Sequence, residues 1–207
     1  MKTQKKLWSA LAALCVATGT VAQPAYNYSK LQKEQLGRGV VAIRENPLDV
    51  VVSWRYLSSD PINTSFNVYR NGEKIAEVPN STGTFYRDTY SGNEKAVYTV
   101  KPVINGVETG KLNGNYTLPA NAPSGYIDIP LDRPAEGVTP SGQKYTYSPN
   151  DASIGDVDGD GEYEIILKWD PSNAHDNAHD GYTGNVYFDC YRLTGEKPVS
   201  YTHLRAH

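Results

Sequence analysis

The amino-acid sequence predicts an all-β protein, and three observations support this fold class. The composition is rich in turn and strand residues, with 18 Gly, 13 Pro and 16 Tyr in 207 residues. Short runs with alternating Val and Ile are separated by turn residues, and Asn71-Gly72 and Asn105-Gly106 are strong hairpin signals. An Asp-rich loop at residues 156–164 then leads directly into the apolar run at residues 165–167, which is typical of a buried strand.

Residues 1–22 are predicted to be a signal peptide. Three lysines precede an apolar core at residues 7–17, and small residues at 20–22 offer a cleavage site before Gln23. The apolar run is too short to span a bilayer. We therefore expect a secreted or periplasmic protein with no membrane association after signal removal. Residues 23–35 are polar and aperiodic and are predicted to be a linker.

Residues 36–120 are predicted to form a β-sandwich, because short strand-like runs recur there with turn signals between them. The runs are 40–43, 49–55, 66–70, 74–78, 84–88, 96–103 and 107–109. The segment resembles a fibronectin type III-like module, with residues 66–72 similar to the central hairpin of that fold. Trp54 is expected to fill the core, and the other aromatic residues are interpreted as core residues. We expect no chemistry in this region.

A second β domain is predicted over residues 121–197. Pro, Asn and Gly at residues 118–125 interrupt strand pairing and mark the boundary. Residues 164–169 and 185–193 are its candidate strands. An Asp-rich loop that leads into a strand is typical of repeat β architectures, above all β-propellers, but no internal repeat is visible. The region is therefore predicted to be the opening, truncated portion of a β-propeller, since one blade cannot bury both its faces.

The Asp-rich loop is predicted to bind Ca²⁺. Calcium takes six to eight oxygen ligands, and carboxylates at alternate positions of a tight loop can face one centre. Gly161 permits the sharp turn, because glycine adopts positive φ at little steric cost. The predicted ligands are Asp156, Asp158, Asp160 and Glu164 through their carboxylates and Glu162 through its backbone carbonyl. We expect such an ion to brace the loop rather than to take part in chemistry.

Two other interpretations of this loop are less favoured. An EF-hand requires a bidentate Glu at position 12 and a following helix, whereas this loop has Leu167 at that position and a strand after it. Asp-Gly pairs also form ordinary turns. Four carboxylates in a spaced register favour a metal ion over a simple turn.

A polar segment after the strand contains His175 and His179, four residues apart. On a helix this spacing would suggest zinc, but the surrounding Pro, Ser, Asn and Gly residues lack helical periodicity, so zinc is not predicted. A second calcium site that uses Asp176, Asn177 or Asp180 is one interpretation. A solvated turn without an ion is the other, and the sequence leaves both open.

The charge and the cysteine content exclude further classes. The formal net charge of −3 would become −6 on removal of residues 1–22, with 17 basic and 23 acidic residues left, and no basic patch stands out. A nucleic-acid partner is therefore not expected. With Cys15 in the removed segment, Cys190 would be alone, so we predict no internal disulfide and a buried thiol.

Three sequence blocks together resemble the bacterial rhamnogalacturonan lyases that open with a fibronectin-like module and continue as an eight-bladed β-propeller. The blocks are residues 129–134 with 137–140, residues 145–170, and Asp176 and Asn177 with residues 180–184. This resemblance covers residues 36–197. It implies an extracellular, calcium-dependent lyase whose partner is a pectic polysaccharide, rhamnogalacturonan I, cleaved by β-elimination.

The resemblance also carries implications for single residues. Asn150 and Asp170 match members of the family's sugar-binding set, and the acidic loop matches its calcium ligands. In the implied reaction a base removes the proton next to the galacturonate carboxylate, and a cation near that carboxylate can stabilise the carbanion. No residue of this chain is identified as the base.

Residues 198–207 resemble nothing in those lyases and are predicted to be a non-native tail. Family members continue well beyond this length, so the chain is predicted to be an N-terminal fragment that is itself inactive. The alternative is a stand-alone calcium-dependent carbohydrate-binding module without catalysis. A general propeller scaffold with no activity on pectin is a third interpretation.

Overall fold

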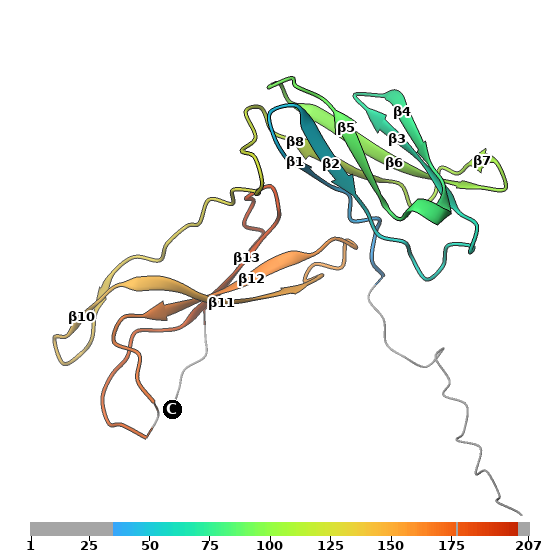
Figure 1. Ribbon diagram of the computed structural model, residues 1–207. Coiled ribbons are helices and arrows are strands. Elements are labelled where there is room, and N and C mark those ends of the chain that lie inside the picture. The colour runs from blue at the N-terminus through green and yellow to red at the C-terminus, as the bar shows by residue number, and fades with distance from the viewer. Residues whose placement is uncertain (1–34, 177, 203–207) are drawn as a thin grey trace, which may run out of the picture. The chain divides into compact units, whose positions relative to one another are not determined.

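Strands with alternating burial form the N-terminal region. The structure is a computed structural model that describes residues 35–176 and 178–202 (Figure 1). One antiparallel sheet has the order β1-β2-β5, with β1 at Val41–Arg44, β2 at Asp49–Ser53 and β5 at Phe85–Thr89. In the other sheet the order is β4-β3-β6, and both β7 and β8 pair with β6. Its strands are β3 (Ser65–Arg70), β4 (Glu73–Val78), β6 (Ala96–Ile104), β7 (Val107–Glu108) and β8 (Gly114–Leu118).

A hydrophobic core is shared by these two sheets. Along β2, Val50 and Val52 are fully buried while their neighbours are partly exposed, as the two-residue period of a strand requires. Trp54 packs edge-on against Phe66 of the other sheet, with ring centroids 5.4 Å apart. The predicted core position of Trp54 is thus confirmed. The region is a β-sandwich, and the prediction of an all-β protein is correct.

Both predicted Asn-Gly hairpins are present. Asn71 and Gly72 connect β3 to β4 with φ of 50° and 85°, and Asn105 and Gly106 connect β6 to β7 with φ of 51° and 78°. Positive φ at both central residues is the signature of a type I′ turn, whose twist matches that of the paired strands. A short 3₁₀ helix, η2 (Asn80–Thr82), lies between β4 and β5.

Glu108 of β7 accepts hydrogen bonds from three side chains of neighbouring strands. Asn67 Nδ2 lies 2.8 Å and Lys101 Nζ 2.9 Å from its carboxylate, and the Tyr69 hydroxyl donates to it as well. These bonds, the one from Asn67 first, lower the pKa of Glu108 from 4.5 to about 2. The carboxylate therefore stays ionised in the folded protein well below its ordinary titration range.

This network should make the free energy of unfolding depend on pH. Because the folded-state pKa of Glu108 lies below its ordinary value, its stabilisation is complete above about pH 5 and is lost as pH falls through 4.5 toward 2. The carboxylate is partly exposed, so the loss should be on the order of 1 kcal/mol. Denaturant unfolding over this pH range should show a flatter dependence for Glu108→Gln than for the wild-type chain. Parallel curves would contradict the role of the network.

The C-terminal region forms a four-stranded antiparallel sheet of order β11-β12-β13-β14 (Figure 1). Its strands are β11 (Tyr147–Gly155), β12 (Glu164–Pro171), β13 (Tyr187–Tyr191) and β14 (Val199–Thr202), preceded by a two-stranded ribbon of β9 (Gly137–Val138) and β10 (Lys144–Tyr145). Tyr147, Leu167, Trp169 and Tyr191 form its buried cluster. Trp169 Nε1 donates to Asp189 over 2.9 Å, which satisfies the buried indole.

The structure contains strands that the sequence patterns did not predict, namely β8, β9, β10, β11 and β14. Strand β14 falls within residues 198–207, the segment predicted to be a non-native tail. Backbone pairing of the kind seen between Cys190 and Val199 is open to any extended segment at a sheet edge, so the origin of the tail stays a prediction. Cys190 is buried, as predicted.

The predicted signal peptide at residues 1–22 lies outside the described residues, as does the predicted linker apart from residue 35. Within residues 35–176 and 178–202, the structure has no helix with the length and hydropathy of a membrane span.

Candidate metal site

The Asp-rich loop connects the end of β11 to the start of β12 and is closed by its own carboxylates. Asp156 Oδ1 accepts a hydrogen bond from Gly159 N over 2.8 Å, and Asp156 Oδ2 accepts one from Gly161 N over 3.0 Å. Asp158 accepts from the backbone N–H of Asp160 over 3.2 Å. Gly159 and Gly161 have φ of 77° and 92°, a region that disfavours side chains. The sequence of alternating Asp and Gly therefore dictates this tight loop.

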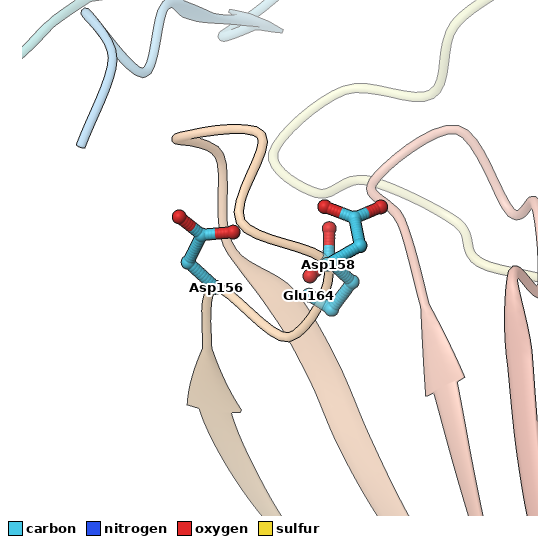
Figure 2. A group of neighbouring side chains, drawn as sticks. All are labelled: Asp156, Asp158 and Glu164. Carbon is cyan, nitrogen blue, oxygen red and sulfur yellow. The ribbon is translucent and has the colours of Figure 1, made fainter. Parts of the chain in front are cut away.

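Three of the predicted ligands come together at the strand ends. Figure 2 shows Asp156, Asp158 and Glu164 where β11 ends and β12 begins. One oxygen from each of the three lies within 4.8 Å of the others. Because Ca²⁺ binds oxygen at 2.3–2.6 Å, two ligands of one ion can be up to about 5 Å apart. The spacing of the three carboxylates fits a single calcium ion.

Glu164 provides a separate indication of a cation. The residue is only 1% exposed. Its Oε2 accepts a hydrogen bond from Val157 N over 2.9 Å, whereas its Oε1 has no hydrogen-bond partner within the described part of the chain. A buried carboxylate oxygen without a donor is costly, and a metal ion would satisfy it. The donor set, oxygen only, suits a hard cation such as calcium.

The other two predicted ligands direct their carboxylates elsewhere. Asp160 Oδ1 accepts from Glu162 N over 2.9 Å, and its Oδ2 lies 3.1 Å from the guanidinium of Arg192. Glu162 Oε1 accepts from Gly39 N over 3.2 Å, and Oε2 lies 3.7 Å from Arg55. The structure thus gathers three of the five predicted residues by their side chains. The role predicted for Glu162 uses its backbone carbonyl and is untouched by the direction of its carboxylate.

Two residues of the N-terminal region, Gly37 and Arg55, donate hydrogen bonds to the backbone of the loop. Gly37 N donates to Gly161 O over 2.6 Å, and Arg55 Nη1 donates to the same oxygen over 3.3 Å. A Cβ on Gly161 would lie 2.8 Å from Gly37 N, so only glycine allows this backbone contact. These partners were not predicted, because they lie more than a hundred positions away along the chain.

Arg192, just after β13, is a further residue that the sequence patterns missed. Its guanidinium contacts Asp158, Asp160 and Glu164, and it lowers the pKa of Asp158. No local signal marks it. Arg192 reaches the loop because β13 pairs with β12, with Tyr191 opposite Ile165.

The two predicted sugar-binding residues lie together at another place on the sheet. Asn150 Nδ2 donates to Asp170 Oδ2, and Lys168 Nζ lies 2.9 Å from Asp170 Oδ1. Lys168 was not predicted, although residues two apart on a strand share a face. Glu164 and Asp170 are six positions apart along β12, a separation of about 20 Å at the usual rise of a strand. The acidic loop and this polar cluster therefore occupy opposite ends of β12.

The described residues of the polar segment after β12 form no second group of this kind. His175 and His179 are exposed, with ring centroids 6.3 Å apart. Asp176 Oδ1 accepts a hydrogen bond from Ala178 N over 2.8 Å, as in an ordinary turn. Among the described residues only Asp156, Asp158 and Glu164 form a group with metal-ligand spacing. Asn177, one of the residues considered for a second calcium site, lies outside them.

Fold and site together define an all-β protein in which a β-sandwich precedes a four-stranded sheet with an oxygen-rich loop suited to a hard cation. Two family models match this chain: "Rhamnogalacturonan I lyases beta-sheet domain" over residues 31–116 and "Rhamnogalacturonan lyase family 11, C-terminal domain" over residues 126–200. The chain belongs to the rhamnogalacturonan lyase family.

Individual relatives agree with this assignment. The rhamnogalacturonan endolyase YesW of Bacillus subtilis (strain 168) is 43% identical over 201 residues, covering 95% of this chain and 31% of the relative. The rhamnogalacturonan exolyase YesX of the same organism is 47% identical over 166 residues, covering 80% and 26%. The crystal structure of YesW superposes with a TM-score of 0.69 at 46% identity, over 83% of this chain and 28% of that one. The chain thus spans less than a third of the length of these relatives.

Proposed function

We propose that these residues belong to a secreted or periplasmic rhamnogalacturonan lyase that cleaves the rhamnogalacturonan I backbone of pectin by β-elimination. The observation that carries this proposal is the 43–47% identity to an endolyase and an exolyase of rhamnogalacturonan. The identity extends over both the sandwich and the sheet with the acidic loop. The proposal is also supported by the resemblance of the structure to those of the same lyases.

The proposed reaction needs groups that hold a uronate and its neighbouring sugar. Asn150 and Asp170 can bind sugar hydroxyls as donor and acceptor, and Asn150 is exposed. Lys168, 2.9 Å from Asp170, adds a positive charge that would attract the carboxylate of galacturonate. We place the substrate-binding role on this cluster and assign no catalytic base among the described residues.

We further propose that the acidic loop holds a calcium ion through Asp156, Asp158 and Glu164, with Asp160 and the carbonyl of Glu162 as the remaining predicted ligands. When bound, the ion would neutralise the repulsion of the carboxylates and fix the connection between β11 and β12. The separation of about 20 Å along β12 from Asp170 argues for this bracing role. It argues against direct contact of this particular ion with a sugar bound at Asn150 and Asp170.

The domain organisation is part of the proposal. A propeller blade is a four-stranded sheet, and β11, β12 and β13 supply three adjacent antiparallel strands within residues 121–197, so we propose that they begin the opening blade of a propeller. The first family match ends at residue 116 and the second begins at residue 126. The gap between them supports a division into domains at 36–120 and 121–197. The 207-residue chain is proposed to be inactive by itself, because it corresponds to under a third of each active relative.

The test is an assay of the whole gene product on purified rhamnogalacturonan I, with unsaturated uronate detected by its ultraviolet absorbance. We expect unsaturated products from rhamnogalacturonan I and none from a polygalacturonate control. The 207-residue chain, assayed in parallel, should yield no product. A whole protein that binds rhamnogalacturonan I without cleaving it would instead support the carbohydrate-binding alternative.

A further inference from the structure

Arg192 brings a permanent positive charge to the carboxylates that we propose as calcium ligands. Its Nη2 lies 2.5 Å from Asp158 Oδ2 and 3.1 Å from Asp160 Oδ2, and its Nε lies 3.9 Å from Glu164 Oε1. An arginine does not lose its proton in proteins. The charge therefore stands beside the loop at every pH at which the carboxylates are ionised.

The contact between Arg192 and Glu164 is incomplete. Within the described residues, Arg192 Nε and Glu164 Oε1 both lack a hydrogen-bond partner, although they are only 3.9 Å apart. Glu164 is buried, so its oxygen has no access to bulk water as a substitute. A closer cationic partner of Glu164 Oε1 would replace this weak contact at little cost.

Arg192 also has another acidic partner outside the loop. Glu196 Oε2 lies 3.7 Å from Arg192 Nη1, and the Glu196 side chain is 62% exposed. The two residues are joined by a turn in which Arg192 N donates to Glu196 O over 2.8 Å. A guanidinium that leaves Asp158 therefore keeps an ion-pair partner without a change of backbone.

We propose that Arg192 is an internal competitor of calcium: it holds the acidic loop together when calcium is scarce and moves off Asp158 and Glu164 when calcium binds. The inference rests on the calcium site of the proposed function. Its consequence is a calcium affinity below the one that the acidic residues alone would give. Coulomb repulsion between a divalent ion and a guanidinium about 6 Å away, with water-like screening, corresponds to about a tenfold effect on affinity.

The proposal is tested by calorimetric titration of the 207-residue chain with calcium chloride. Arg192→Gln should bind calcium about tenfold more tightly at low ionic strength, and the gain should shrink as salt is added. The same variant should melt at a lower temperature than the wild type in chelator, because the unpaired carboxylates repel one another. Arg192→Lys keeps the charge and should bind calcium within about threefold of the wild type.

A matched control removes the same charge at a distant place. Arg87 pairs with Glu45 on the sandwich, and both side chains are exposed, so Arg87→Gln should leave calcium affinity unchanged. Calcium binding by the wild type with equal or weaker binding by Arg192→Gln would overturn the inference and leave the calcium site standing. Absence of binding by both chains would overturn the site and the inference together. Binding by Arg192→Gln alone would support both.

Discussion

Glutamine in place of Glu164 is expected to lower the affinity for calcium at least about 100-fold, since affinity in such sites follows the number of charged ligands. Glu164 is the buried member of the three-carboxylate group, and one of its oxygens has no hydrogen-bond donor. Glutamine has nearly the same shape and can still accept the bond from Val157 N. The loss should therefore come from charge rather than from disruption of the loop. Calcium titration, together with melting curves in calcium and in chelator, measures it.

Glu162→Gln is the matched control, since it makes the same chemical change two residues earlier in the loop. The Glu162 carboxylate contacts Gly39 N and Arg55 rather than the carboxylate group, and its backbone carbonyl is unaltered by the substitution. Its affinity for calcium should stay within about threefold of the wild type. Equal losses in both variants would show that loop stability, not coordination by Glu164, controls binding. Unchanged affinity in both would remove Glu164 from the ligand set.

If the acidic loop holds calcium as we propose, chelation should lower the stability of the chain rather than act directly on a sugar bound at Asp170. An ion bound at Glu164 is about 20 Å along β12 from Asp170, too far to touch a sugar held there. In that proposal calcium would fix the β11–β12 connection, and β12 carries both Asp170 and Lys168. The loop and the polar cluster are coupled through the strand that they share.

The sequence predicted the acidic loop well because its geometry is local. Asp156 bonds to the N–H groups of Gly159 and Gly161, all within six residues, so the spacing alone determines the turn. The directions of Asp160 and Glu162 depend on Arg192 and Arg55, which tertiary structure brings in from distant positions. No spacing rule within the loop could have predicted those partners.

The strands also divide into those with a local sequence signal and those that only their pairing partners define. The hairpins at Asn71 and Asn105 follow from local turn chemistry, and β2 follows from its run of three β-branched valines. Strand β11 has no such pattern, because nearly all its residues after Tyr147 are exposed. It is extended because it pairs with β12 from Tyr147 opposite Pro171 to Gly155 opposite Glu164. Such a strand is defined by its neighbour rather than by its own hydrophobic period.

Asparagine in place of Asp60 is expected to destabilise the sandwich by about 3–5 kcal/mol, the usual result of breaking one side of a buried ion pair. Arg38 is fully buried, and its Nη1 and Nη2 lie 2.6 Å and 3.0 Å from the two oxygens of Asp60. Arg38 also donates to the carbonyls of Arg55 and Leu112. These bonds hold its guanidinium in the core when the charge of Asp60 is removed. The substitution leaves a buried guanidinium without its counter-ion.

The pair Arg87–Glu45 provides the comparison for this last prediction. It has the same chemistry and the same 2.6 Å separation as Arg38–Asp60, but its side chains are 56% and 39% exposed. Glu45→Gln should change the free energy of unfolding by less than about 1 kcal/mol, because water already screens the charges. Denaturant unfolding in chelator, which removes any contribution of calcium at the acidic loop, measures both variants. Similar small losses would mean that water reaches Arg38 when Asp60 is lost, and that burial does not set the strength of this pair.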